Sequence, residues 1–519
     1  MLLHFHLDFN DRLDSVLKFD SSVTQRSDQS QERHSRLFLL IIILTALTAA
    51  RLVGLKFSVV DLYYDEAQYW SWAQDPALGY FTKPPLLAWV IAGITRVCGN
   101  SEWCVRSPAP VFYFATSIVV YFIGRTLYDE RTGLWAGLLT AFTTGIVFSS
   151  RIISTDVPLL LFWALSLLAY VKLLDRPTIE WATVLGLSIG LGLLSKYAMV
   201  YFFAGVVLAA FMNGPARALL KNPLLWIAFF VALIVVSPNL IWNISNSFTT
   251  FKHTGSLVLD EPFNPNPLRA LEFFCSQFGV IGPIVFTVMI VATLKLKSAD
   301  LIAQDRLMVA FFVIPILVVT AFAFFAQAFA NWASPACISG LVLAAAVLTR
   351  QHQWRWLWAS IALGGVMQAT LLYSDAIATR LSIFDSNPYH RTMGWSAFGA
   401  RVGQLAMASG AQAIANDSRG EFAALRYYAR DRSQTVLSFA TSDSPRFDSF
   451  HPVTQSSPEP LLFVTTCPDP KRLQVFYGDV VALGPLKIPV VLKRERTFFA
   501  FKLSKNKGPI DALPECKAE

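Results

Sequence analysis

The stretch from Asp61 to Pro85, DLYYDEAQYWSWAQDPALGYFTKPP, directly follows an apolar segment long enough to cross a lipid bilayer. It holds adjacent carboxylates, Asp65 and Glu66, and a lysine before two prolines, Lys83-Pro84-Pro85. Tyrosine and tryptophan are dense between these groups. The sequence therefore predicts a charged, aromatic-rich loop that lies against a membrane surface.

The composition is that of a polytopic membrane protein. The 519 residues are 54% hydrophobic and 15% charged, whereas soluble proteins contain about 25% charged residues. The net charge of +8 comes with Lys and Arg in short loops between apolar runs, which is an orientation signal for membrane proteins. Membrane lipids are therefore the predicted partners, and nothing indicates a nucleic acid.

Apolar runs predict about eleven membrane segments between residues 37 and 374, in an all-α fold. Residues 1–36 are polar and are expected to form a cytoplasmic extension. One segment, Trp181–Met212, is interrupted at Ser195-Lys196 and counts twice, because both of its ends meet loops on the inner side. The segments are Leu37–Phe57, Val105–Leu127, Thr132–Ser150, Val157–Leu174, Trp181–Met212, Leu224–Trp242, Leu271–Leu294, Leu307–Ala328, Ala333–Leu348 and Trp356–Tyr373.

Basic residues decide the predicted orientation. If the N-terminus is cytoplasmic, every short inner loop carries Lys or Arg, as the positive-inside rule requires. The first loop, residues 57–104, and the C-terminal region, residues 375–519, then lie on the outer side. The inner residues are Arg125, Arg131, Lys172, Arg176, Arg217, Lys221, Lys295, Lys297, Arg306, Arg350 and Arg355.

The C-terminal region 375–519 is predicted to be a small α/β domain outside the membrane. Short apolar runs, Val436–Phe439 and Leu461–Thr465, alternate with helical patterns such as Glu421–Arg430. Residues 441–460 are predicted to form a loop. Four of the six cysteines fall on the predicted outer side, where disulfides are permitted. Of three connectivities, the local one pairs Cys98 with Cys104 and Cys467 with Cys516.

Charged groups near the outer ends of the segments have two interpretations each. Lys196 faces a polar cavity, because a lysine in lipid is costly, or it extends to the outer surface. Arg151 and Asp156, in RIISTDVP, form a structural salt bridge, or both face the same cavity as Asp65 and Lys196. In the second interpretation all four groups belong to one site.

A carboxylate beside several cations at a membrane surface suits the transfer of a sugar from a polyprenyl phosphate. The cations stabilise the departing phosphate, and the carboxylate accepts the proton of the attacking hydroxyl. Asp65 and Glu66 point about 100° apart if they lie on a helix, so they are expected to have different roles. The aromatic residues flank a sugar ring or form an interfacial belt; they are Tyr63, Tyr64, Tyr69, Trp70 and Trp72.

The ordered series YYDEAQYW, GYFTKPPL, RIISTDVPL and GLGLLSKY resembles bacterial members of the protein O-mannosyltransferase-related superfamily. These are glycosyltransferase family 39 and its aminoarabinose- and galacturonosyl-transferring relatives. The resemblance covers about residues 37–350 and implies the GT-C membrane fold. It also implies inverting transfer from a polyprenyl-phosphate sugar to lipopolysaccharide or lipid A, on the periplasmic side of the bacterial inner membrane.

The resemblance assigns roles residue by residue. Asp65 matches the catalytic carboxylate and Lys83 a lysine that binds the lipid phosphate. Lys196 and Arg151 are predicted to hold the same phosphate, while Glu66, Asp156 and Tyr64 are predicted to contact sugar or acceptor. Tyr197 stands where relatives often have glycine, which leaves the direction of Lys196 open. The stretches FFCSQFGVIGP and NWASP also match, with no role assigned.

Two other functions compete with this prediction. Protein O-glycosylation differs only in the acceptor. A transporter or lipid flippase would often show repeats with broken helices at the midplane, whereas this sequence shows one broken segment, no repeat, and charges gathered on one side. No cluster has zinc-finger spacing, so no metal and no cofactor other than the sugar donor are expected.

Overall fold

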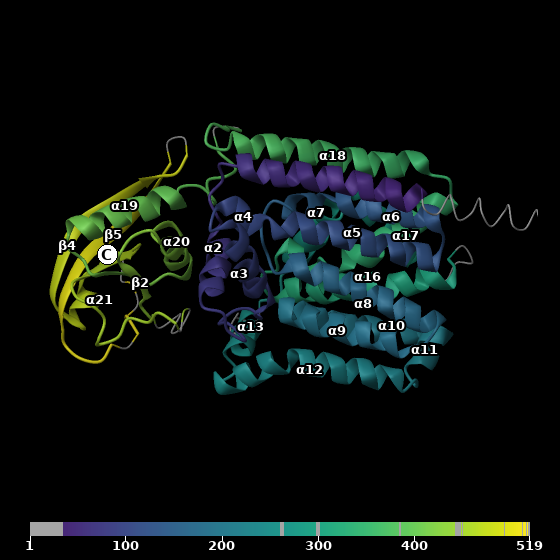
Figure 1. Cartoon of the computed structure of the whole chain (residues 1–519), viewed down its shortest axis with the longest axis horizontal. Helices are drawn as coiled ribbons and strands as arrows, with labels where there is room; N and C mark the ends of the chain where they lie inside the picture. Colours follow the sequence, from purple (N-terminus) through teal and green to yellow (C-terminus); the bar gives the residue numbers. More distant parts are fainter. Residues whose placement is uncertain are drawn as a thin grey trace, which may run out of the picture.

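A computed structural model describes residues 35–516, except 260–263, 297–300, 384–385, 442–447, 449, 492–493, 511 and 515. The predicted extension 1–36 therefore lies almost wholly outside the described residues, and so does part of the predicted loop 441–460. Figure 1 shows a bundle of roughly parallel and antiparallel helices with a smaller α/β unit at one end.

The bundle confirms a multi-pass membrane protein. Six of the described helices are long and apolar enough to cross a membrane, and several shorter apolar helices lie among them. The long ones are Ser35–Phe57, Glu102–Leu127, α8 (Asp156–Asp175), α12 (Leu224–Ser245), α16 (Ala303–Phe325) and α18 (Trp354–Ala376). The others are α6 (Glu130–Phe142), α7 (Thr144–Ser149), α9 (Ile179–Ser195), α10 (Tyr201–Met212), α11 (Gly214–Leu219), α14 (Pro267–Val280), α15 (Pro283–Leu294) and α17 (Ala336–Arg350).

Burial distinguishes the centre of the bundle from its rim. In its most apolar window α8 is 72% buried by the rest of the chain, whereas α12 is only 22% buried. The exposed side chains of α12 before its last residue are apolar, including Phe230 and Ile234. An apolar surface of this extent fits contact with lipid, because a water-facing helix would carry polar residues there.

Three spans are broken, of which the sequence predicted one. The predicted break at Ser195-Lys196 is confirmed, because α9 ends at Ser195 and α10 begins at Tyr201. The predicted continuous spans Thr132–Ser150 and Leu271–Leu294 were wrong, since α6 stops before Thr143 and α14 stops before Ile281.

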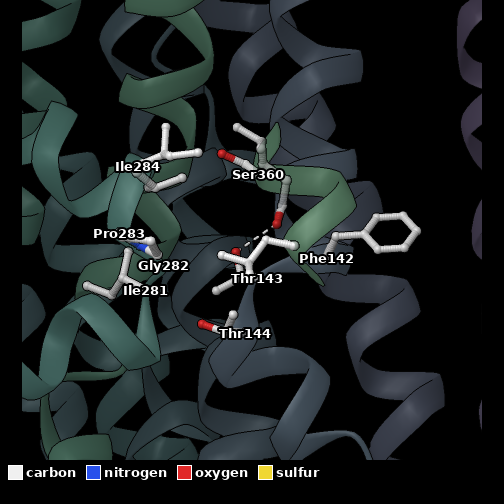
Figure 2. A pocket seen from close by; sticks show the side chains of 11 residues that line it. Phe142, Thr143, Thr144, Ile281, Gly282, Pro283, Ile284 and Ser360 are labelled. Atoms are coloured by element: carbon white, nitrogen blue, oxygen red, sulfur yellow. Dashed lines mark hydrogen bonds between the residues drawn. The ribbon is translucent and has the colours of Figure 1, made fainter. Parts of the chain in front are cut away.

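The two unpredicted breaks support each other. The Thr144 hydroxyl donates to the carbonyls of Gly279 and Val280, so one broken helix satisfies backbone groups freed in the other. Gly282 takes a φ of 97°, a left-handed conformation that favours glycine. Figure 2 shows both breaks beside Ser360 of α18. Hydropathy cannot predict such hydrogen bonds, because they join segments that are far apart in the sequence.

The first loop folds into three short helices at one end of the bundle. They are α2 (Tyr64–Gln74), α3 (Leu86–Cys98) and α4 (Glu102–Arg106), where α4 continues into α5 (Pro108–Leu127). Figure 1 shows them between the bundle and the C-terminal unit. α3 buries one apolar face through Leu87, Ala88, Ile91 and Ala92. The helix α13 (Thr249–Leu259) lies beside this layer.

The C-terminal unit is a mixed five-stranded sheet in the order β2-β1-β3-β5-β4. Strands β1 to β3 are parallel, and β5 joins the sheet antiparallel to β3 and β4. The predicted runs became β2 and β3, and the predicted helix became α20. The elements are β1 (Ala413–Asn416), β2 (Thr435–Ser438), β3 (Leu461–Thr465), β4 (Tyr477–Pro489), β5 (Glu495–Asn506), α19 (Trp395–Ala408), α20 (Arg419–Tyr428) and α21 (Lys471–Gln474).

Both predicted disulfides are present, which settles the connectivity. Cys98 is bonded to Cys104 across the end of α3, and Cys467 is bonded to Cys516 in the C-terminal unit. The free cysteines lie in the bundle: Cys275 is exposed and Cys337 is buried.

Candidate active site

The N-terminus of α2 is fixed by a buried carboxylate. Glu66 accepts two hydrogen bonds from Arg106 of α4, at 2.9 and 2.7 Å, and one from the backbone N–H of Ile153 at 2.9 Å. It also accepts from the N–H of Tyr63 at 2.9 Å, where α2 begins. Both side chains of the ion pair are 3% exposed. Glu66 therefore ties the first loop to the bundle, and neither of its oxygens is left for a substrate.

Asp65 points to the other side of the same helix. Its side chain is 36% exposed, and its Oδ1 accepts a hydrogen bond from Nη2 of Arg419 at 3.1 Å. In the described part of the chain Oδ2 has no hydrogen-bond partner. Burial raises the pKa of Asp65, and the nearby Arg419 and Lys83 oppose that rise. Asp65 is thus placed to accept a proton from a substrate.

Lys83 lies at the tip of the loop before α3. Neighbouring helices hold this loop, because Asn239 of α12 donates to the carbonyl of Leu78 and Thr250 of α13 donates to that of Tyr80. Within the described residues the Lys83 ammonium has no ion pair or side-chain hydrogen bond. Burial and the neighbouring Lys196 lower the pKa of Lys83 to about 8. Lys83 is half-buried, and a partly desolvated cation without a protein partner favours the binding of an anion.

Asp156 and Lys196 form a second pair at the same end. Nζ of Lys196 donates to Oδ1 of Asp156 at 2.8 Å, and the side chains are 15% and 7% exposed. Asp156 also accepts from Asn331 at 2.7 Å and from Ser334 at 2.8 Å. The NWASP stretch thus has a physical role, which is to hold Asp156.

The tyrosine that follows Lys196 does not disturb the backbone. Lys196 is extended, with φ of −161°, and Tyr197 starts a short 3-10 helix, so no left-handed residue is needed there. The Tyr197 hydroxyl donates to Asn239 at 2.8 Å. Tyr197 therefore anchors the break to α12, while Lys196 points to Asp156.

Arg151 does not join the group around Asp65. The predicted Arg151–Asp156 salt bridge was wrong, because Arg151 instead pairs with Asp375 at the end of α18, at 2.8 Å. Its guanidinium lies over the rings of Phe148 and Tyr389. The packing of α18 beside α7 brings Asp375 close, so Arg151 links two parts of the bundle end.

The aromatic residues of the first loop mostly form a core. Tyr69, Trp70 and Trp72 are 6%, 4% and 5% exposed. Trp70 meets the ring of Tyr427 of α20 edge-on, and Trp72 stacks on Tyr80. Because these three rings are buried, they do not form an exposed membrane belt. Tyr63 and Tyr64 are half-buried and pack on each other.

Tyr64 lies next to Asp65 and faces the C-terminal unit. The Arg419 guanidinium lies 5.8 Å from the centre of its ring. A Cβ atom on Gly420 would sit 3.3 Å from that ring, so the small residue lets α20 approach α2 closely. Tyr64 is therefore at the edge of the charged group, between Asp65 and the C-terminal unit.

Two hollows of the bundle lie away from this group. One, in Figure 2, has about 10 Å³ of free space, the size of one water, and is lined mostly by apolar residues such as Ile284 and Leu363. The other, of about 980 Å³, lies at the far end and is lined by Arg36, Arg125, Arg131 and Arg350 among others. Neither hollow is lined by a predicted site residue. The candidate site is therefore located by its charged side chains and not by these hollows.

Sequence reasoning missed four contact residues. Arg419 and Arg106 bind the two adjacent carboxylates, and Asn331 and Ser334 bind Asp156. Arg106 had a usable signal, because an arginine at the start of an apolar span is rarely buried unless it is paired. Nothing local marks Arg419, which lies 354 residues from its partner.

The assembled site contains Asp65, Lys83, Lys196 and Asp156, with Arg419 and Tyr64 at its outer edge. Such a group can bind an anion and accept a proton beside it. Among the described residues, no group of three or more His, Cys, Asp or Glu could hold a metal ion.

Comparison with known proteins gives the class and then the family. The fold is similar to that of ArnT from Cupriavidus metallidurans bound to undecaprenyl phosphate, with a TM-score of 0.59 and 13% identity over 89% of this chain and 97% of that one. This similarity shows the GT-C fold of membrane glycosyltransferases. A model of the family dolichyl-phosphate-mannose-protein mannosyltransferase matches residues 82–242.

Sequence similarity extends over most of the chain. The lipid A galacturonosyltransferase RgtD of Rhizobium johnstonii is 33% identical over 409 residues, which are 78% of this chain and 85% of that protein. The undecaprenyl phosphate-alpha-4-amino-4-deoxy-L-arabinose arabinosyl transferase of Pseudomonas paraeruginosa is 33% identical over 178 residues, 32% of each chain. The chain belongs to the family of GT-C glycosyltransferases that includes RgtD and the aminoarabinose transferases.

Proposed function

We propose that the protein is an inverting glycosyltransferase that moves a sugar from a polyprenyl phosphate to lipid A or another lipopolysaccharide acceptor. The observation that carries the proposal is Asp65 beside the cation Lys83: among the described residues, one oxygen of Asp65 and the ammonium of Lys83 have no protein partner. The names of the family members support both substrates, since one acts on lipid A and another uses an undecaprenyl phosphate sugar.

The proposed reaction is a single displacement at the anomeric carbon. The acceptor hydroxyl oxygen forms a bond to this carbon while the bond from carbon to phosphate oxygen breaks. The electron pair of the broken bond stays on the polyprenyl phosphate, and the hydroxyl proton moves to Oδ2 of Asp65. The products are a glycosylated acceptor of inverted configuration and free polyprenyl phosphate.

The cations have the task of stabilising the leaving group. Lys83 and Lys196 lie near each other and near Asp65, so we assign them to the phosphate. Asp156, held by Asn331 and Ser334, positions Lys196. Arg151 and Glu66, which have protein partners of their own, are assigned to positioning the bundle end and the first loop.

The proposed setting is the bacterial inner membrane, with the charged group on the periplasmic side. The first-loop helices, which carry Asp65, lie at the end of the bundle that meets the C-terminal unit. The opposite end carries Arg125, Arg131 and Arg350. This asymmetry agrees with a cytoplasmic N-terminus under the positive-inside rule. The count of about eleven membrane segments and the periplasmic position of the C-terminal domain, residues 375–519, belong to the same proposal.

The test is mass spectrometry of lipid A and core oligosaccharide. Cells with the gene deleted receive the wild type, Asp65→Asn, or Asp75→Asn. Asp75 is the matched control, because it lies just after α2 and forms an ion pair with Arg426, away from Lys83. We expect one sugar to be lost in the deletion strain and to return with the wild type and Asp75→Asn alone.

Unchanged glycolipids in the deletion strain would contradict the proposed acceptor. Secreted proteins would then be searched for a missing glycan, which is the protein O-glycosylation alternative.

A further inference from the structure

The C-terminal domain contributes a residue to the candidate site. Arg419 is the first residue of α20, and this helix packs closely on α2. Two further contacts fix the arrangement: the Tyr427 hydroxyl donates to the carbonyl of Asn100, and the Tyr428 hydroxyl accepts from the backbone N–H of Leu62 at 2.6 Å. The position of Arg419 next to Asp65 is therefore held by a built interface.

The placement of Arg419 is unfavourable for the helix alone. The N-terminus of a helix carries partial positive charge and favours anions, so a cation there destabilises it slightly. Ser418, at the N-cap, makes no capping hydrogen bond with its side chain. A residue that breaks a local rule in this way is expected where function requires it.

Arg419 has hydrogen-bond capacity to spare. A guanidinium carries five N–H donors in a planar fork, and within the described residues Arg419 uses one terminal nitrogen, for Asp65. Its side chain is 31% exposed. The remaining edge fits a carboxylate through two parallel hydrogen bonds, a geometry that lysine cannot provide.

The proposed function assigns Lys83 and Lys196, but not Arg419, to the lipid phosphate. Burial together with the nearby Arg419 and Lys83 lowers the pKa of His253 to about 4, so that it is neutral at pH 7. Lys83 belongs to the first loop and Lys196 to the break between α9 and α10, whereas Arg419 comes from the C-terminal domain. One phosphate at the membrane surface leaves Arg419 unassigned.

We propose that Arg419 binds the carboxylate of a uronic acid, and so selects an acidic sugar on the donor. This inference rests on the proposed function and deepens it. A uronic acid carries its carboxylate and its anomeric carbon on the same ring, so binding to Arg419 brings that carbon close to Asp65, the ion-pair partner of Arg419. An amino sugar would place its ammonium against the guanidinium, and a neutral sugar would leave the donors of Arg419 unpaired.

The test compares two donors that differ only in this group: polyprenyl phosphate galacturonate and polyprenyl phosphate galactose. The purified full-length wild type is measured beside Arg419→Lys, Arg419→Ala and Arg426→Ala. Arg426→Ala is the matched control, because it removes another ion pair between α20 and α2 without touching Asp65.

We expect the wild type to prefer galacturonate. Arg419→Ala lowers kcat/KM for galacturonate about 10- to 100-fold, the effect of losing a charged hydrogen bond, and changes that for galactose far less. Arg419→Lys gives an intermediate loss, since it keeps the charge and loses the fork. Arg426→Ala leaves the ratio of the two donors unchanged.

Two outcomes overturn the inference while the proposed function survives. One is a wild type that uses galactose as well as galacturonate, and the other is an equal loss on both donors in Arg419→Lys or Arg419→Ala, which would mean that Arg419 acts only through Asp65. If Arg419→Ala does not fold, Arg419→Lys and the wild type decide. A wild type that transfers neither sugar contradicts the proposed function itself.

Discussion

Asp65 and Glu66 are consecutive residues of α2 with the same charge, and they meet opposite environments. Glu66 is 3% exposed and gives both oxygens to Arg106 and the backbone. Asp65 is 36% exposed and gives one oxygen to Arg419. Because consecutive residues of a helix point about 100° apart, one carboxylate enters the protein interior and the other reaches the site.

The two arginine partners differ in the same way. Arg106 belongs to α4, at the start of a membrane helix, and is as buried as Glu66, whereas Arg419 belongs to the C-terminal domain and keeps access to solvent. A buried pair holds structure together and is costly to break, while a half-exposed pair contributes little stability. An acidic dipeptide can therefore combine an anchor with a reactive group, and substitutions separate the two.

The largest effect is expected from Asp65→Asn. The amide cannot accept the proton of the acceptor hydroxyl, so turnover should fall about 10²- to 10⁴-fold, the usual contribution of a positioned base. The unfolding temperature in detergent should stay near that of the wild type, because the pair with Arg419 is half-exposed. Wild-type turnover in this variant would exclude Asp65 as the base.

Glu66→Gln should act on stability. It leaves the Arg106 charge buried without a full partner, at a cost of about 3–5 kcal/mol. Thermal unfolding of purified protein measures this loss, and activity at low temperature should survive in the folded fraction. A Glu66→Gln protein as stable as the wild type but inactive would reverse the two roles.

Asn331→Ala tests the contacts that hold Asp156. It removes a hydrogen bond of 2.7 Å to a carboxylate, and the misplaced Asp156 and Lys196 should lower kcat/KM for the donor about 10-fold. Asn246→Ala, at an exposed asparagine after α12, is the control and should leave kcat/KM unchanged. Equal values for the two variants would remove NWASP from the site.

The smallest effect is expected from pH. The pKa of Lys83 is lowered to about 8, so kcat/KM for the donor should fall by about half at that pH and further above it, as Lys83 loses its proton. On the acid side, kcat/KM should fall as Asp65 gains a proton, at a pH above its ordinary value, because burial raises its pKa.

Lys83→Arg sharpens the pH measurement. Arginine keeps its charge throughout the accessible range, so the alkaline limb should disappear from the profile while the acid limb stays. An alkaline limb that persists in Lys83→Arg would assign it to another group.

The local features of this protein could be predicted from the sequence. Apolar runs indicate the long helices, and an interrupted run with basic loops at both ends indicates the break at Ser195-Lys196, confirmed by α9 and α10. Short separations favour the disulfides Cys98–Cys104 and Cys467–Cys516. Disulfides between nearby cysteines depend on residues close in the sequence, and membrane helices depend on the free energy of moving apolar side chains from water to lipid. Spacing and hydropathy, which can be read from the sequence, predict both.

Only the tertiary structure decided which charges meet. Arg151 pairs with Asp375 instead of Asp156, Asp156 is held by the distant NWASP stretch, and Asp65 meets Arg419 from another domain. A sequence pattern records the faces that an element buries, but the partner on each face depends on the packing of elements hundreds of residues apart. The sequence therefore determined the membrane fold and the carboxylate at its surface, and packing determined which of the two adjacent carboxylates is free to react.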